Sequence, residues 1–146
     1  GEAMPVRSAT ATWEGALQTG KGTMAAGSGA FSFPFSFGTR FGEEAGTNPE
    51  ELIAAAYAGC FSMALSAQLG RAGYEPERIQ TTARVRIQQV DGRIVIDRIE
   101  LETEAKVPGI DPAKFQEIAE QTKLGCPVGN ALSNVPEIVL TARLAS

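Results

Sequence analysis

The longest apolar stretch of the chain, residues 52–69, places the strongest constraint on its fold. It follows Asn48-Pro49, a pair typical of a helix start, because asparagine is a good N-cap and proline fits the first helical turn. Apolar residues then recur at helical spacing to about Gly70. Polar side chains interrupt the stretch at four positions, so we interpret it as a buried core helix rather than a membrane span.

This helix is poor in charge on every face, so we expect it to be buried nearly all round. Its most regular apolar stripe includes a cysteine in the middle of the helix. The stripe consists of Ile53, Ala56, Tyr57, Cys60, Met63, Ala64 and Ala67.

Alternating apolar residues predict strands on both sides of the helix. The predicted strands are Val6–Glu14, a second one ending near Ala26, Thr81–Val90, Arg93–Val107 and Glu137–Leu144. Asp91-Gly92 predicts a tight hairpin turn. The Phe-rich segment Phe31–Phe37 contains Pro34, which disfavours a central strand and favours an edge or a loop.

Two further helices are predicted, one from Asp111-Pro112 to about Lys123 and one from Cys126-Pro127 to about Ser133. This order of elements indicates an α+β fold, with an antiparallel sheet packed on the long central helix. We expect one domain over residues 4–146. Residues 1–3, which precede Met4, are interpreted as a remnant of the expression vector.

The composition excludes several classes of chemistry. The net charge of −4 gives no basic footprint for nucleic acid. The chain has no histidine, which excludes Cys-His and Ser-His catalysis and histidine metal sites. Two cysteines alone cannot form a typical structural zinc site. With few cysteines and no recognisable secretory signal, we expect a cytoplasmic protein with reduced thiols, no membrane association and no metal or cofactor.

Cys60 has two interpretations. A free cysteine is often only a small core residue. A reactive Cys60 needs a nearby cation, because a mid-helix apolar site disfavours the thiolate and the helix N-terminus is too far away to help.

Cys126 has a stronger local signal, because Pro127 fits a first helical turn and would put Cys126 at the N-cap. Free N–H groups at a helix start favour a thiolate. Cys126 could equally be only a cap or turn residue. The two cysteines could form a structural disulfide, although a redox pair is favoured in the cytoplasm. Arg40, Glu50 and Glu51 are by themselves ordinary surface and first-turn residues.

Two longer motifs change this balance. Thr47–Leu52 (TNPEEL) and Ala55–Leu65 (AAYAGCFSMAL), together with Lys123–Leu132 (KLGCPVGNAL), closely resemble the OsmC/Ohr family of osmotically inducible and organic hydroperoxide resistance proteins. The resemblance covers nearly the whole chain. The Gly-Thr-Arg segment at Arg40 and the Ser-Met-Ala-Leu run are more similar to the OsmC branch than to the Ohr branch.

The resemblance implies a thiol peroxidase without a cofactor. Cys60 matches the peroxidatic cysteine, Cys126 the resolving cysteine, Arg40 the arginine that activates the thiolate, and Glu50 the active-site acid. Glu51 is interpreted mainly as a capping residue. The implied cycle reduces a hydroperoxide to an alcohol, forms a Cys60 sulfenic acid and then a Cys60–Cys126 disulfide, and ends with reduction by an external dithiol, for which a lipoyl-type compound is plausible.

The spacing adds a prediction about assembly. Glu50 and Cys60 are ten residues apart in one helix, which is roughly 15 Å along its axis. If both belong to one site, a second chain must supply Glu50. We therefore expect an intertwined homodimer, which the family also implies.

Apolar neighbours of Cys60 predict an organic substrate. Tyr57, Phe61, Met63 and the Phe31–Phe37 segment would favour an alkyl or lipid hydroperoxide over hydrogen peroxide. Two other functional classes stay open: a non-enzymatic thiol redox sensor or ligand-binding protein on the same fold, and a structural protein with inert cysteines.

Overall fold

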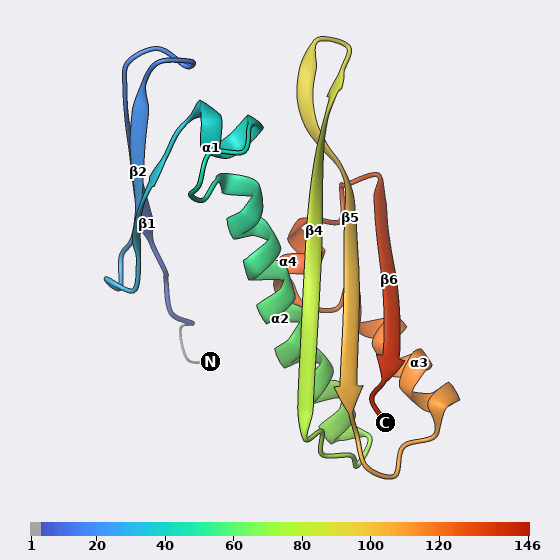
Figure 1. Cartoon of the computed structure of the whole chain (residues 1–146). Helices are drawn as coiled ribbons and strands as arrows, with labels where there is room; N and C mark the ends of the chain where they lie inside the picture. Colours follow the sequence, from blue (N-terminus) through green and yellow to red (C-terminus); the bar gives the residue numbers. More distant parts are fainter. Residues whose placement is uncertain (1–3) are drawn as a thin grey trace. The chain divides into compact units, whose positions relative to one another are not determined.

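The computed structural model describes residues 4–146, so the interpretation of residues 1–3 lies outside the described residues. The chain divides into two compact units (Figure 1). The first unit ends at Pro49 and the second is Glu50–Ser146. The expectation of one domain over residues 4–146 stays a prediction, and each unit is described by itself.

The first unit contains a three-stranded antiparallel sheet in the order β1-β2-β3. Its strands are β1 (Ala9–Glu14), β2 (Lys21–Ala26) and β3 (Ser32–Phe35). The Phe-rich segment therefore forms an edge strand, as Pro34 predicted. The short helix α1 (Phe37–Phe41), which follows β3, was not predicted.

The second unit packs helices on a three-stranded sheet in the order β4-β5-β6 (Figure 1). Its elements are α2 (Pro49–Arg71, which begins at the last residue of the first unit), β4 (Arg78–Val90), β5 (Arg93–Lys106), α3 (Pro112–Thr122), α4 (Pro127–Ala131) and β6 (Glu137–Leu144). The predicted helices and strands are all present, and the α+β class is confirmed.

The β4–β5 hairpin turns at Asp91-Gly92, where both residues have positive φ, 51° and 78°. These angles are those of a type I′ turn, as the dipeptide predicted. β4 and β5 pair antiparallel, whereas β6 pairs parallel to β5. The expected antiparallel pairing is therefore wrong for this last strand, and the sheet is mixed. The reason is the crossover through α3 and α4, which returns the chain in the direction of β5.

Helix α2 packs one face into the core of the second unit. Tyr57, Phe61, Leu65 and Leu69 are fully buried and recur every four residues. They pack with apolar side chains of β5 and α3, including Ile99, Leu101 and Phe115. At about 25 cal/mol per Å² of apolar surface, burial of these side chains is the main stabilising contribution of the helix.

The opposite face of α2 is open in the single chain, so the expectation of burial nearly all round is wrong there. Met63, placed in the predicted buried stripe, is 77% exposed. Ala55, Ala56, Gly59 and Ala67 are also exposed. The helix is long and apolar enough to cross a membrane by length and composition alone. Its large buried side chains in the core agree with the interpretation as a core helix.

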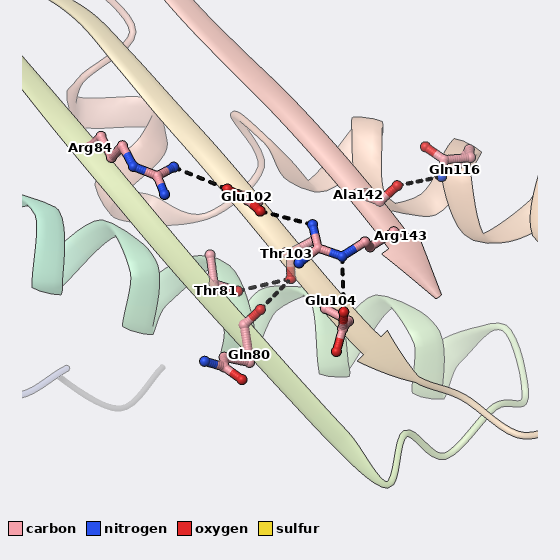
Figure 2. Close-up of polar contacts among 9 residues, drawn as sticks. All are labelled: Gln80, Thr81, Arg84, Glu102, Thr103, Glu104, Gln116, Ala142 and Arg143. Atoms are coloured by element: carbon pink, nitrogen blue, oxygen red, sulfur yellow. Dashed lines mark hydrogen bonds and ion pairs between the residues drawn. The ribbon is translucent and has the colours of Figure 1, made fainter. Parts of the chain in front are cut away.

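The strands of the second unit carry a ladder of charged side chains (Figure 2). Glu102 on β5 pairs with Arg84 of β4 at 3.1 Å and with Arg143 of β6 at 2.9 Å. Arg143 also binds Glu104 at 2.9 Å. Because these side chains are solvated, each pair contributes little to stability. The ladder mainly specifies the register of three neighbouring strands.

Candidate functional site

Cys60 lies in the middle of α2, on the turn after the buried Tyr57. Its thiol is free and partly exposed, and its side chain packs against the edge of the buried cluster. It lies eleven residues from each end of the helix, so the helix dipole contributes little to its chemistry. The predicted mid-helix position of Cys60 is confirmed.

Cys126 is the N-cap of α4, as Pro127 predicted. Its backbone is extended, with φ −90° and ψ 152°. The backbone N–H of Gly129 donates a hydrogen bond to the Cys126 Sγ at 3.3 Å. The side chain is only 1% exposed. The sulfur therefore takes the place of the usual oxygen cap in a site that solvent scarcely reaches.

Burial reverses the electrostatic effect expected at this N-cap. Desolvation raises the pKa of the Cys126 thiol, and interaction with the Cys60 thiol raises it further. The hydrogen bond from Gly129 acts in the opposite direction and does not compensate. The expectation that the helix start favours a Cys126 thiolate is therefore wrong. A buried thiolate loses more hydration than one N–H group and a five-residue helix restore.

The structure brings the two cysteines together. They are 66 residues apart in the sequence, yet their side chains are within hydrogen-bonding reach of each other, both as free thiols. Cys60 is partly exposed and Cys126 is buried. An oxidised Cys60 would therefore meet the Cys126 thiol without entering solvent.

Tyr57 interacts with both cysteines. The sequence indicated it only as an apolar neighbour of Cys60 and not as a hydrogen-bonding residue of the site. Its phenol donates a hydrogen bond to the backbone carbonyl of Lys123 at 2.5 Å. Burial, followed by the influence of Cys126 and Cys60, raises the pKa of Tyr57 to about 12. Its position three residues before Cys60, on one helix face, is the signal that could have indicated it.

Arg40 lies in the first unit, near the end of α1. Ser36 caps this helix through a capping box with Thr39. The Arg40 guanidinium carbon lies 5.0 Å from the centre of the Phe41 ring, within the range of a cation–π contact. The side-chain amide of Asn48 donates to the Thr39 carbonyl at 2.9 Å and ties the segment before α2 to this helix.

An aromatic pocket of about 220 Å³ adjoins Arg40 within the first unit. The Trp13 and Phe35 rings are 5.3 Å apart. A side chain at Gly22 would lie 2.6 Å from the Phe35 ring and 2.7 Å from the Trp13 ring, so glycine is needed there. The pocket is lined by Trp13, Leu17, Phe35, Ser36, Phe37, Arg40 and Phe41.

Glu50 and Glu51 occupy the first turn of α2, where acidic residues stabilise the helix dipole. Because α2 is continuous from Pro49 to Arg71, Glu50 and Cys60 of one chain are separated by roughly 15 Å along the axis. They do not meet within one chain. The roles of Arg40 and Glu50 in a site with Cys60 stay predictions.

The apolar neighbours expected to bind substrate fall into two groups. Tyr57 and Phe61 are fully buried core residues, and Met63 lies on the exposed face of α2. Tyr57 and Phe61 thus belong to the core of the single chain, and a role of these three residues in favouring an organic substrate stays a prediction. Within the Phe-rich segment, Phe35 and Phe37 do line a pocket. Among residues 4–146, no group of three His, Cys, Asp or Glu side chains is arranged to hold a metal ion.

The chain is similar to several known proteins. Residues 42–141 match the family model described as OsmC-like protein. Peroxiredoxin OsmC of Escherichia coli K12 is 50% identical over 137 residues, which are 93% of this chain and 94% of that protein. The organic hydroperoxide resistance protein of Xanthomonas axonopodis pv. citri is 34% identical over 97 residues, 66% of each chain.

Two solved structures agree with these relationships. The organic hydroperoxide resistance protein of Elizabethkingia anophelis superimposes with a TM-score of 0.74, at 26% identity, over 99% of both chains. The OsmC-like protein of Mycoplasma pneumoniae reaches a TM-score of 0.75 at 16% identity, over 97% of this chain and 99% of that one, and so shares the fold. The chain therefore belongs to the OsmC-like family, and its higher identity to peroxiredoxin OsmC places it in the OsmC branch.

Proposed function

We propose that the chain is a thiol-dependent peroxidase that reduces organic hydroperoxides to alcohols in the cytoplasm. The observation that carries the proposal is the pairing of a partly exposed Cys60 with a buried Cys126 whose side chains interact. This arrangement suits a cysteine that meets peroxide and a second cysteine that waits for its oxidised product. The names of two relatives, a peroxiredoxin and an organic hydroperoxide resistance protein, support the same chemistry.

The first step is attack of the Cys60 thiolate on the distal oxygen of the hydroperoxide. The O–O bond breaks, the alkoxide leaves as the alcohol after taking a proton, and Cys60 becomes a sulfenic acid. In the second step the Cys126 sulfur attacks the Cys60 sulfur, and water leaves as the disulfide forms. A dithiol then exchanges with the disulfide and becomes oxidised itself, which restores both thiols.

The buried state of Cys126 suits this division of work. Since its pKa is raised, Cys126 stays a protonated thiol near neutral pH and does not compete with Cys60 for peroxide. Its proton leaves with the hydroxyl group of the sulfenic acid as water. The two sulfurs already interact before oxidation, so the disulfide step needs little rearrangement.

Arg40 is proposed to favour the Cys60 thiolate and to stabilise the charge that develops as the O–O bond breaks. Glu50 is proposed to orient Arg40 through a charge-assisted pair. The aromatic pocket beside Arg40 supports an alkyl or aryl hydroperoxide as substrate, because it offers an apolar lining next to a cation. These roles follow the resemblance to the family.

A homodimer is proposed as the active unit. The exposed apolar face of α2, with Met63 at its centre, supports an interface with a second chain, because soluble proteins rarely leave such a face open. A second chain could also supply the Glu50 that α2 keeps about 15 Å from Cys60 of its own chain.

The activity is tested by steady-state assay with cumene hydroperoxide and hydrogen peroxide, with either dihydrolipoamide or a thioredoxin system as reductant. We expect faster turnover of cumene hydroperoxide, faster recycling by dihydrolipoamide, and only the uncatalysed rate in Cys60→Ser. Undiminished turnover in Cys60→Ser would disprove the proposal. Oxidation without repeated turnover by any dithiol would instead support a redox sensor.

The shared site is tested by mixing two inactive variants, Glu50→Gln and Cys60→Ser. If Glu50 acts across the interface, each mixed dimer regains one site with both residues intact, and activity returns. Native mass spectrometry confirms that mixed dimers have formed. Mixed dimers without activity would show that Glu50 does not act across the interface. Met63→Glu, which places a charge on the open face, should weaken the dimer in sedimentation experiments.

A further inference from the structure

The phenol of Tyr57 connects the two segments that carry the cysteines. Tyr57 is part of α2, three residues before Cys60, and is fully buried. Its hydroxyl donates to the carbonyl of Lys123, the C-cap residue that follows α3, at 2.5 Å. Cys126 follows three residues later. One hydrogen bond therefore joins the helix of the first cysteine to the turn that places the second.

The same ring also packs against the first turn of α4. A Cβ atom at Gly129 would lie 3.0 Å from the Tyr57 Cε1, 3.1 Å from its hydroxyl and 2.6 Å from the Lys123 carbonyl oxygen. Gly129 is the residue whose N–H binds the Cys126 sulfur. The phenol, the Lys123 carbonyl and the Gly129 backbone thus form one packed unit around the cap at Cys126.

The phenol acts only as a donor over the physiological pH range. Burial raises the pKa of Tyr57 to about 12. Tyr57 therefore stays protonated near neutral pH. What it does provide at all these pH values is a fixed hydrogen bond to a backbone carbonyl.

We propose that Tyr57 is a positioning residue for disulfide formation: its hydrogen bond to Lys123 and its contact with Gly129 hold the Cys126 sulfur against Cys60. The inference rests on the proposed peroxidase function for the step it serves. In that step the Cys126 sulfur attacks the Cys60 sulfenic sulfur, the S–S bond forms and the S–O bond breaks. The hydroxyl group leaves with the Cys126 proton as water.

This geometry matters because a disulfide tolerates little displacement. The two Cα atoms must lie about 4.4–6.8 Å apart with suitably directed Cβ atoms. A turn released from α2 samples positions outside that range. Loss of the phenol hydroxyl should therefore slow the second chemical step and leave the first, which takes place at Cys60 alone.

The test compares the parent with Tyr57→Phe, which keeps the ring and removes the hydroxyl. Rapid mixing with cumene hydroperoxide gives the rate of sulfenic acid formation, and quenching with dimedone gives the lifetime of the sulfenic acid. We expect sulfenic acid formation within about twofold of the parent and disulfide formation slowed at least about tenfold. The dimedone adduct of Cys60 should accumulate.

An equilibrium measurement tests the same role without peroxide. In a glutathione redox buffer, the constant for forming the Cys60–Cys126 disulfide should fall about tenfold in Tyr57→Phe, equivalent to about 30 mV. If the parent forms the disulfide but does not reduce hydroperoxides, the proposed function fails. The equilibrium measurement still decides the role of Tyr57.

Ser62→Ala is the matched control. Ser62 is on the same helix, two residues after Cys60, and its hydroxyl binds Thr81 at 2.8 Å and the Ala58 carbonyl at 2.8 Å. The Ser62→Ala variant lacks a comparable hydroxyl group away from the Cys126 turn, and it should keep the parental rate of disulfide formation. If Tyr57→Phe does not fold, Gly129→Ala carries the test, because its Cβ displaces the same carbonyl and ring.

Two results would overturn the inference. One is disulfide formation in Tyr57→Phe, or in Gly129→Ala, at the parental rate and with the parental equilibrium constant. The other is a matching loss in Ser62→Ala, which would reduce the role of Tyr57 to general stability of α2.

Discussion

The two cysteine regions of the second unit differ in nearly every physical respect. Cys60 is in the middle of a 23-residue helix, far from both helix ends, and its thiol is partly exposed. Cys126 is the N-cap of a five-residue helix, accepts a hydrogen bond from Gly129, and is 1% exposed. Judged by local helix electrostatics, Cys126 has the better site for a thiolate.

Burial nevertheless decides the chemistry of Cys126, because its pKa is raised despite the N-cap. A helix terminus stabilises a charge by about 0.3–1 kcal/mol, whereas loss of hydration for a buried charge is several times larger. The comparison teaches that local secondary structure ranks thiols poorly until their exposure is known. It also agrees with the different places that we propose for the two cysteines in one reaction sequence.

The largest expected effect is the difference in hydroperoxide reduction between Cys60→Ser and Cys126→Ser. Cys60→Ser should lose hydroperoxide reduction to the uncatalysed rate, in single and multiple turnover alike. Cys126→Ser should still consume about one hydroperoxide per chain, and mass spectrometry should then find a sulfenic acid or its dimedone adduct at Cys60. Reversal of this pattern would exchange the roles of the two regions.

The next effect is a difference in alkylation rate. Iodoacetamide at neutral pH should label Cys60 at least about a hundredfold faster than Cys126, because Cys126 reacts only after local opening. Peptide mass spectrometry measures both sites in one sample. In urea the difference should vanish, and persistence of the difference there would show that burial is not its cause.

The buried phenol of Tyr57, which contacts both cysteine regions, should make the folded protein less stable at alkaline pH. The phenol has a folded-state pKa of about 12, above the ordinary value of 10.0. The protonated phenol therefore favours the folded state, and this contribution is complete below pH 10 and declines as the pH rises to about 12. This difference in pKa corresponds to about 2–3 kcal/mol in the free energy of unfolding.

Urea unfolding at several pH values measures this effect. The parent should lose about 2–3 kcal/mol more than Tyr57→Phe between about pH 9.5 and 12. The Cys126 thiol contributes a decline of the same sign from about pH 8.5, and this decline should be common to both proteins. Parallel pH profiles for the parent and Tyr57→Phe would contradict the burial of an un-ionised phenol.

The smallest expected effect concerns Ser62, which anchors α2 to the sheet through Thr81 and, beyond it, Thr103. Ser62→Ala should lower the free energy of unfolding by about 1 kcal/mol, the usual contribution of one hydrogen bond. The alkylation rates of the two cysteines should keep their ratio. A changed ratio would show that the hydroxyl chain also sets the geometry of the cysteines.

The sequence was sufficient for the helix around Cys60 and for the N-cap at Cys126, because both rest on local rules. Asn48-Pro49 predicts where α2 begins, and Pro127 predicts the first turn of α4. The bounds of β6 and the turn at Asp91-Gly92 follow from similar local signals. The family motifs then predicted the two cysteines as partners, which no local rule provides.

The buried face of α2 was not predictable in the same way. Almost every position of this helix is apolar or small, so periodicity does not distinguish Met63, which is exposed, from Phe61, which is buried. The pKa of Cys126 was misjudged for a related reason. Burial depends on the side chains that surround the sulfur in three dimensions, and Tyr57 and Lys123 come from other parts of the chain.

The parallel strand β6 has a consequence for biosynthesis. The crossover that carries Cys126 is held by this last strand, since Gln116 of α3 binds the Ala142 carbonyl at 2.7 Å (Figure 2) and Lys123 binds the Ile138 carbonyl at 3.3 Å. Parallel pairing closes a long loop and is slow. On a translating ribosome, these contacts form only after β6 has left the exit tunnel. Until then, the nascent crossover that carries Cys126 lacks the contacts that hold it on the sheet.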